Sequence, residues 1–171
     1  FNEANAIWIS VGLVVANFAV TILATMIMDN FNRKTLLTFG SIVMTAALAI
    51  LTVLNYTVSV ETAAIPTMLL IATYIFGFAI SWGPIAWLLI GEIFPMSVRG
   101  IGSSIGSAAN WIGNFLVSQF FLVLLAVFHN NVGGPFGVFA VFAFISIFFV
   151  RYLVPETRGK SLEEIEMELR K

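Results

Sequence analysis

Long apolar stretches alternate with short polar segments along the chain. Four stretches, residues 4–28, 35–60, 62–91 and 101–150, contain no Asp, Glu, Lys or Arg. A helix that crosses a bilayer needs about 20 apolar residues and satisfies its own backbone hydrogen bonds, whereas a membrane β-barrel would show alternating strands of about ten residues. The pattern therefore predicts an all-α membrane protein with about five spans, at about 7–28, 36–54, 66–90, 103–128 and 135–153.

The breaks between these predicted spans have local causes. Residues 29–34 are charged and rich in Asn, and residues 55–66 are polar. Residues 95–100 and 130–135 contain Pro and Gly, which favour turns. Residues 154–171 form a tail, in which Ser161 and Glu164 have the spacing of a capping box. A short amphipathic helix is therefore expected in the tail, with an apolar stripe at Leu162, Ile165 and Leu169.

Composition supports a membrane protein and excludes several other classes. Hydrophobic residues make up 60% of the chain, charged residues 10%, and the mean hydropathy is +1.01. A soluble domain would need a more polar surface. The chain has no cysteine, and no paired catalytic acids, metal-ligand set or Ser/His constellation falls inside the predicted spans. We therefore expect no enzyme activity, metal, cofactor or nucleic-acid partner.

The basic residues predict an orientation in the membrane. All eight Lys and Arg residues fall on one side of the five-span arrangement, and Glu61 and His129 are the only acid or histidine in the loops on the other side, 55–66 and 129–134. The positive-inside rule then places the tail in the cytoplasm and the N-terminus outside, in a plasma or inner cell membrane. An odd number of spans and the missing initial Met predict the C-terminal part of a longer protein.

Two groups of polar residues at membrane depth need partners. Asn17 and Thr21 share one helical face, and Asn110 and Asn114 share another. Each group could form hydrogen bonds between helices or face a ligand. Small residues at 102–107 favour close helix packing.

A proline inside an apolar stretch predicts a broken helix. Pro84 removes a backbone hydrogen bond, so a break is expected at Gly83 and Pro84. Trp87 shares a face with Gly83 and is either a packing residue or a flat apolar surface for a sugar ring. Trp82 lies off that face and is expected to pack against a neighbouring helix.

Acidic and basic residues occur together at the predicted cytoplasmic ends of the spans. These clusters either anchor the helices at the interface or form ion pairs that break and re-form between conformations. They are Asp29 with Arg33 and Lys34, Glu92 with Arg99, and Glu156 with Arg158 and Lys160.

Four motifs together resemble the sugar porter family of the major facilitator superfamily. The segment 29–34 resembles that family's Asp-Arg-x-Gly-Arg-Arg/Lys loop, although Asn30 and Asn32 depart from it. The segment Ser81-Trp82-Gly83-Pro84 is similar to the corresponding sequence in bacterial xylose–proton symporters. The other motifs are Gly83-Pro84-x-x-Trp87, Glu92-x-x-Pro95-x-x-x-Arg99-Gly100 and Pro155-Glu156-Thr157-Arg158-Gly159.

The resemblance implies functional residues and absent partners. Sugar contacts would be Asn17, Gly83, Trp87 and Asn110, with Phe78 and Trp111 as aromatic walls. A cytoplasmic charge network would comprise Asp29, Arg33, Glu92, Arg99, Glu156 and Arg158. The chain would supply the last five of twelve helices, so seven preceding helices would be missing, including a first-helix acid that marks proton coupling in some members.

The resemblance implies a secondary transporter of monosaccharides, hexose or pentose, that works by alternating access. Sugar:proton symport is the leading prediction. The alternatives are a facilitative uniporter, a transporter-like sugar sensor, or a folded but inert fragment. The expected partners are a monosaccharide, protons, the lipid bilayer and the missing helices.

Overall fold

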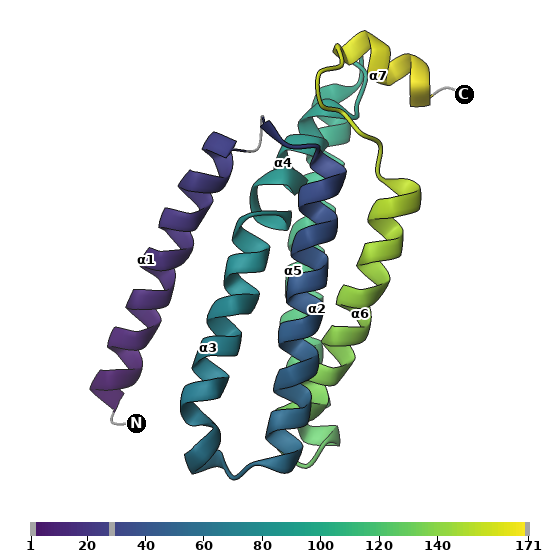
Figure 1. Cartoon of the computed structure of the whole chain (residues 1–171). Helices are drawn as coiled ribbons and strands as arrows, with labels where there is room; N and C mark the ends of the chain where they lie inside the picture. Colours follow the sequence, from purple (N-terminus) through teal and green to yellow (C-terminus); the bar gives the residue numbers. More distant parts are fainter. Residues whose placement is uncertain (1–2, 28–29, 170–171) are drawn as a thin grey trace.

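The computed structural model describes residues 3–27 and 30–169, and these residues form a bundle of long helices (Figure 1). No strand occurs among the described residues. The elements are α1 (Glu3–Ile27), α2 (Arg33–Thr57), α3 (Val60–Ala79), α4 (Trp82–Glu92), α5 (Arg99–Val127), α6 (Gly133–Leu153) and α7 (Leu162–Leu169). The prediction of an all-α membrane fold is confirmed.

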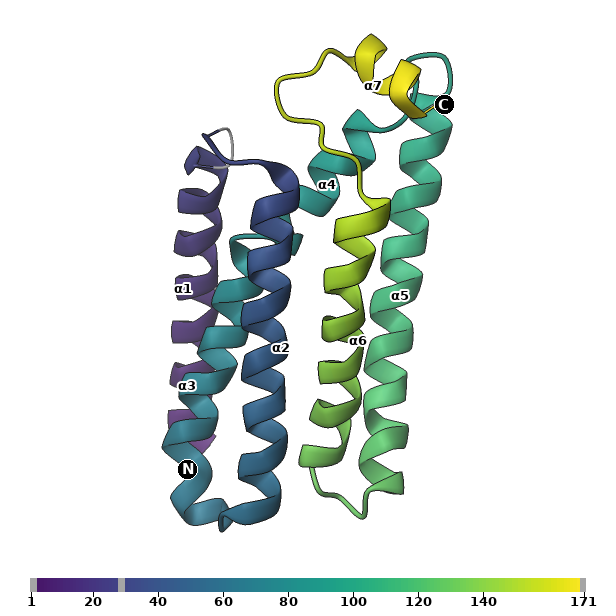
Figure 2. The ribbon, with the colours of Figure 1, turned by 45° about the vertical axis from the view of Figure 1, so that its right-hand side comes forward.

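The helices are arranged around α2 and α3. α2 packs chiefly against α6 and α3, while α1 lies along α3 (Figures 1 and 2). α4 continues beyond α3 after a break and contacts α5. α7 lies across one end of the bundle, and the N-terminus lies at the other end (Figure 1).

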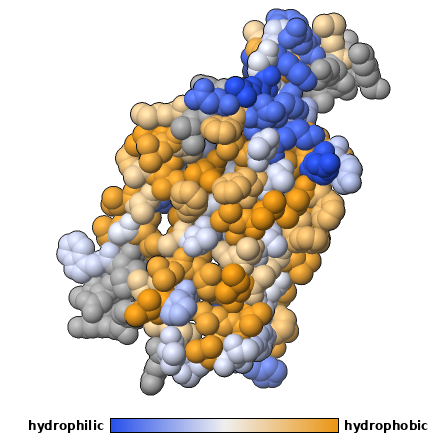
Figure 3. All heavy atoms as spheres, viewed as in Figure 1, coloured by the Kyte–Doolittle hydropathy of each residue, from blue (hydrophilic) through white to orange (hydrophobic). Residues whose placement is uncertain are grey.

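Four helical segments within the described residues are long and apolar enough to cross a membrane. These are Arg33–Thr57, Thr62–Glu92, Arg99–Val127 and Gly133–Leu153, and the apolar segment Ser10–Met26 of α1 is shorter. Apolar residues cover the sides of the bundle, whereas hydrophilic residues gather at the end near α7 (Figure 3). The placement of the membrane boundaries stays a prediction.

The prediction of a polar loop at 55–66 is wrong, because α2 and α3 both extend into this segment. α2 continues to Thr57 and α3 begins at Val60. Asn55 and Thr57 bond back to carbonyls of their own helix, at Leu51 and Val53. Polar side chains satisfied in this way do not end a helix, and Pro66 lies inside α3.

Two apolar clusters hold the central helices together. One cluster joins α2, α4, α6 and the residue that follows α6, through Leu37, Ile85, Val150 and Val154. The other joins α2 to α6 through Leu48, Leu51 and Ala140. The first cluster fixes α4, and therefore the candidate site, against the rest of the bundle.

Candidate functional site

The apolar stretch over residues 62–91 folds as two helices, α3 and α4, with Ile80 and Ser81 between them. In a continuous helix residue 84 would donate its N–H to the carbonyl of Ile80. Proline has no N–H, and its ring collides with that carbonyl. The break therefore lies three residues before the predicted position at Gly83 and Pro84, and these two residues belong to the first turn of α4, where N–H groups have no helical acceptor.

The break packs directly against α2. Ser81 is fully buried, and its hydroxyl donates to the carbonyl of Gly77 at 2.6 Å. A Cβ atom at Gly40 would overlap the Ser81 side chain, so the close approach of α2 depends on glycine at that position. The backbone is thereby held firmly at the point where α3 ends.

A hydrogen-bonded group ties Trp82 to two other helices. The indole N–H of Trp82 donates to Ser41 Oγ of α2 at 2.9 Å. Ser146 Oγ of α6 lies 2.9 Å from the same hydroxyl and 2.7 Å from the carbonyl of Ala143. Trp82 does contact neighbouring helices, as the sequence suggested, and it also fixes the start of α4.

A cavity of about 420 Å³ lies beside the break, between the α3–α4 segment and α5. It brings together five of the six predicted sugar contacts and three further residues. The predicted ones are Phe78, Gly83, Trp87, Asn110 and Trp111, and the further ones are Trp82, Ala86 and Asn114. None of the lining residues is charged, so the cavity suits an uncharged ligand with apolar faces and hydroxyl groups.

Two amides supply the polar side of this cavity. Asn114 Nδ2 donates to Asn110 Oδ1 at 2.9 Å and to the Asn110 carbonyl at 3.0 Å. Because the Asn110 oxygen accepts this bond, the Nδ2 group of Asn110 is left to donate to a ligand. The one-turn spacing of the two residues was the sequence signal for this pair, whereas Ala86 carried none.

Asn17 lines a separate cavity. It lies between α1 and α3 in a pocket of about 150 Å³. Phe78 lines both this pocket and the 420 Å³ cavity. Asn17 Oδ1 is buried and has no hydrogen-bond partner among the described residues. The Thr21 hydroxyl bonds back to the Asn17 carbonyl at 2.8 Å. The structure therefore does not bring Asn17 together with Trp87 and Asn110.

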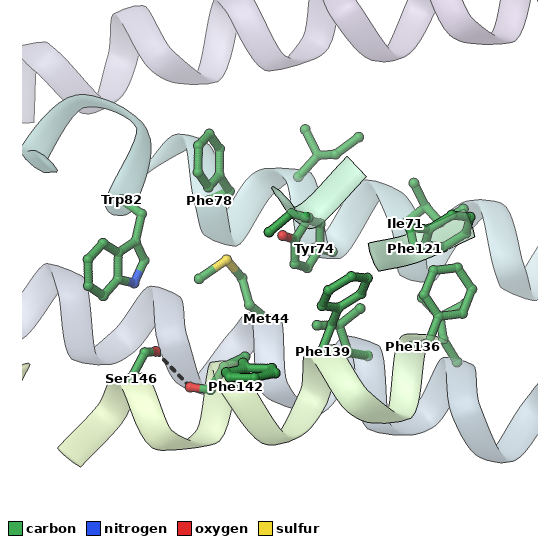
Figure 4. Close-up of a pocket in the computed structure, with 15 residues that line it drawn as sticks. Met44, Ile71, Tyr74, Phe78, Trp82, Phe121, Phe136, Phe139, Phe142 and Ser146 are labelled. Carbon is green, nitrogen blue, oxygen red and sulfur yellow. Dashed lines mark hydrogen bonds between the residues drawn. The ribbon is translucent and has the colours of Figure 1, made fainter. Parts of the chain in front are cut away.

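A larger cavity, about 650 Å³, lies between α2, α3, α5 and α6 and is lined almost entirely by apolar side chains (Figure 4). Phe121 and Phe139 stack across it with ring centroids 6.3 Å apart. The polar groups at its wall are few, and Trp82 and Ser146 already bond to Ser41. The Tyr74 hydroxyl is a further polar group of the lining (Figure 4), so this cavity offers a sugar fewer hydrogen-bonding groups than the 420 Å³ cavity does.

The charged end of the bundle contains a helix cap supplied from far along the chain. Glu156 Oε1 accepts the backbone N–H of Arg33 at 3.0 Å, and Oε2 accepts that of Lys34 at 3.1 Å. These are the first N–H groups of α2, where a carboxylate is favoured by unsatisfied donors and the helix dipole. Asn32, at the N-cap position, makes no side-chain cap bond and accepts instead from Arg158 Nη1 at 3.3 Å.

An ion pair links α2 to the end of α4. Arg33 Nη2 lies 3.9 Å from Glu92 Oε1, and these side chains are only 9% and 22% exposed. Arg99 instead binds the turn before α5, because its Nε donates to the Phe94 carbonyl at 3.3 Å. Asp29, the remaining predicted member, lies outside the described residues.

The tail helix begins as predicted. Glu164 Oε2 accepts the Ser161 N–H at 2.8 Å, and Ser161 Oγ accepts the Glu164 N–H at 3.3 Å. This is the reciprocal capping box. Ile165 is buried, so α7 is attached to the bundle by its apolar side.

Fold and site together define a class of protein. Long apolar helices, one of them broken beside an uncharged cavity, form the arrangement in which secondary transporters build their binding sites. The chain is part of a multi-pass membrane protein with this arrangement. More narrowly, it belongs to the Sugar (and other) transporter family, whose sequence model matches residues 2–169.

Individual relatives agree with this assignment. A D-xylose transporter of Levilactobacillus brevis is 37% identical over 99% of this chain and 37% of its own length. The glucose transporter GlcP of Staphylococcus epidermidis is 40% identical over 98% of this chain and 37% of its own length. The solved structure of the proton:xylose symporter XylE, a major facilitator protein bound to 6-bromo-6-deoxy-D-glucose, superposes with a TM-score of 0.86 at 33% identity. That match covers 98% of this chain and 35% of XylE, so the chain spans little more than a third of the relatives it resembles.

Proposed function

We propose that the whole protein carries monosaccharides, hexose or pentose, across a cell membrane by alternating access, as a sugar:proton symporter. The observation that carries this proposal is the uncharged cavity of about 420 Å³ beside the α3–α4 break. Its volume falls within the range of about 300–1,000 Å³ that small-molecule sites occupy. The relatives' printed activities, transport of D-xylose and of glucose, support a sugar as the cargo.

Within this proposal, each wall of the cavity has a role. The indole rings of Trp87 and Trp111 and the ring of Phe78 offer flat apolar faces to the C–H surfaces of a sugar. Asn110 donates to a sugar hydroxyl, and Gly83 lets the ligand approach the backbone. Phe78 lines both the Asn17 pocket and the 420 Å³ cavity. Asn17 would contact the sugar only if the Phe78 side chain moved aside.

The charged end would act as the inner gate and lie in the cytoplasm. Glu156 joins the tail to α2, and the Arg33–Glu92 pair joins α2 to α4, so both contacts link segments far apart in sequence. Breaking them would free the inner end of α4, while the contacts of Ser81 and Trp82 hold its outer end. Arg99 and Arg158 would complete this network, with Asp29 as a further proposed member.

A proton-binding carboxylate would have to come from the rest of the protein. The apolar stretches of this chain contain no Asp or Glu, so nothing within its predicted spans could carry a proton on a carboxylate. A facilitative uniporter is the alternative. Uptake that follows an imposed pH gradient supports symport, and uptake that ignores it supports uniport.

Counterflow of labelled xylose and glucose by the full-length protein in liposomes tests the sugar proposal. Trp87→Ala should reduce counterflow at least tenfold, because it removes the central aromatic wall. Trp8→Ala is the matched control, since Trp8 is exposed on α1, at 73%, and lines none of the three cavities described above. Equal activity of Trp87→Ala and the parent protein would overturn the site, and no counterflow by the parent protein with any monosaccharide would overturn the function.

A further inference from the structure

A groove of about 770 Å³ lies at the charged end of the bundle, between the start of α2 and the end of α6. Its polar part consists of Lys34, Thr35 and Thr38 from α2 and Arg151 from α6. Three hydrogen bonds hold Lys34 in place. Its backbone N–H donates to Glu156, and its carbonyl accepts from Thr38. Its Nζ donates to the Arg151 carbonyl at 3.0 Å. Two positive charges therefore stand at the rim of one groove.

The rest of the groove is apolar and open to its surroundings. Phe39 and Ile42 continue along α2 below the basic residues, and their side chains are 50% and 51% exposed. Tyr152 of α6, 75% exposed, also lines the groove and directly follows Arg151. Tyr is enriched at membrane–water interfaces, where one end of its ring is apolar and the other is polar.

The groove is distinct from the sugar cavity. It uses α2 residues that alternate with the buried ones, such as Leu37 and Ser41, which face α4 and α6. None of its lining residues lines the 420 Å³ cavity. A ligand here would meet α2 and α6 from the side of the bundle and not from its centre.

We propose that this groove binds an anionic phospholipid, with its phosphate between Lys34 and Arg151 and its acyl chains along Phe39 and Ile42. Basic pockets between membrane helices are suited to acidic lipid headgroups. No Asp or Glu lines the groove, so no carboxylate of the lining pairs with the ammonium of a zwitterionic lipid. The bound lipid bridges α2 and α6 beside the Glu156 cap and stabilises that end of the bundle. The inference depends on these helices crossing a membrane and not on the sugar site.

The test uses the full-length protein purified in a neutral detergent. Retention of dioleoyl-phosphatidylglycerol and of dioleoyl-phosphatidylcholine is measured by native mass spectrometry, and thermal unfolding is followed with each lipid added. The parent protein should prefer phosphatidylglycerol, and Arg151→Gln should weaken its retention roughly fivefold, as loss of one basic group near a membrane surface implies. Lys34→Gln with Arg151→Gln should remove the preference altogether.

Two variants separate a specific site from general charge and from damage to the fold. Lys160→Gln makes the same charge change in the tail, outside the groove, and should leave the preference unchanged. Arg151→Lys keeps the charge and should retain it. Equal losses in Arg151→Gln and Lys160→Gln would show diffuse attraction, and equal retention of the two lipids by the parent protein would show that no anionic site exists or that other parts of the protein cover it. Competition by glycerol 3-phosphate as effective as that by the lipid would show a free-phosphate site. Each of these three results overturns the proposal.

Discussion

The choice between a neutral and an ionic cargo is made by single side chains at the α3–α4 break. The polar groups of the 420 Å³ cavity are carboxamides and indole N–H groups, and its other walls are aromatic, Ala or Gly. Carboxamides both donate and accept hydrogen bonds without carrying charge. They can bond to hydroxyl groups that donate and to hydroxyl groups that accept, but they cannot neutralise an ion. The proposed cargo is therefore a sugar and not a sugar phosphate or an amino acid.

The bond between Asn114 and Asn110 predicts that these residues act as one unit. Asn110→Ala should weaken sugar binding about fivefold, because one neutral hydrogen bond contributes about 1 kcal/mol. Asn114→Ala should weaken it nearly as much by releasing the Asn110 amide, and the double variant should be no worse than Asn110→Ala alone. Sugar titration of the full-length protein, followed by tryptophan fluorescence, measures all three. Asn55→Ala is the control, since Asn55 bonds to its own helix away from the cavity. Strictly additive losses would contradict the coupling.

At the scale of elements, α4 is held at both ends by different kinds of contact. Ser81 and Trp82 tie the start of α4 to α2 and α6. The far end of α4 is held by the partly buried Arg33–Glu92 pair. Rotation of α4 about its anchored start would therefore open the inner end while Gly83 and Trp87 stay near the sugar.

Trp82→Phe should test this anchor, because phenylalanine keeps the apolar ring and removes the N–H donor. We expect a loss of about 1 kcal/mol in stability, and a larger effect on the maximal transport rate than on the sugar KM, since the ring still lines the cavity. Ser41→Ala should have a similar effect, and the two changes together should be less than additive. Thermal unfolding and initial-rate transport measure these effects, with Trp8→Phe as the matched control. A change in KM alone would instead make Trp82 a direct sugar contact.

The Glu156 cap predicts a second effect at this scale. Glu156→Gln removes the negative charge at the α2 N-terminus, where such a charge is worth roughly 0.3–1 kcal/mol, up to about 2 when partly buried. We expect lower thermal stability of the arrangement described here and easier opening of the charged end. The parent protein at the same pH is the reference. If Glu156→Gln and the parent protein unfold at the same temperature, the cap contributes no measurable stability.

The sequence predicted the elements better than it predicted their contacts. Charge-free stretches locate the long helices because lipid imposes that requirement on each helix separately. The break lies three residues before its predicted position, since the clash of Pro84 acts on the carbonyl four residues earlier. The cap of α2 by Glu156 and the tether from Trp82 to Ser41 join residues 123 and 41 positions apart, and no local pattern encodes such distances.

At the scale of the whole molecule, the exposure of α5 bears on how the proposed sugar site is completed. α5 carries one wall of the sugar cavity, yet none of its most apolar window is buried, and Trp111 is 68% exposed. In the relatives, nearly two thirds of the length lies outside the matched region. We infer that helices from the rest of the protein complete the cavity, so substrate preference depends on residues that these 171 positions do not include.

The distribution of charge across the molecule predicts which end faces the cytoplasm. The described Lys and Arg residues lie at helix ends or in the tail: Arg33 and Lys34 begin α2, Arg99 begins α5, Arg151 is in the last turn of α6, and Arg158 and Lys160 follow α6. Hydrophilic residues gather at the end of the bundle near α7 (Figure 3). From the positive-inside rule we expect this end to face the cytoplasm. The chain has no cysteine, so single cysteines can report on each end if any cysteines elsewhere in the full-length protein are first replaced. Ser59→Cys, in the connection between α2 and α3, should react with a membrane-impermeant maleimide in intact cells, whereas Ser161→Cys should react only after permeabilisation. The reverse labelling pattern would invert the orientation and place the Glu156 cap, the Arg33–Glu92 pair and the proposed lipid groove on the outer side.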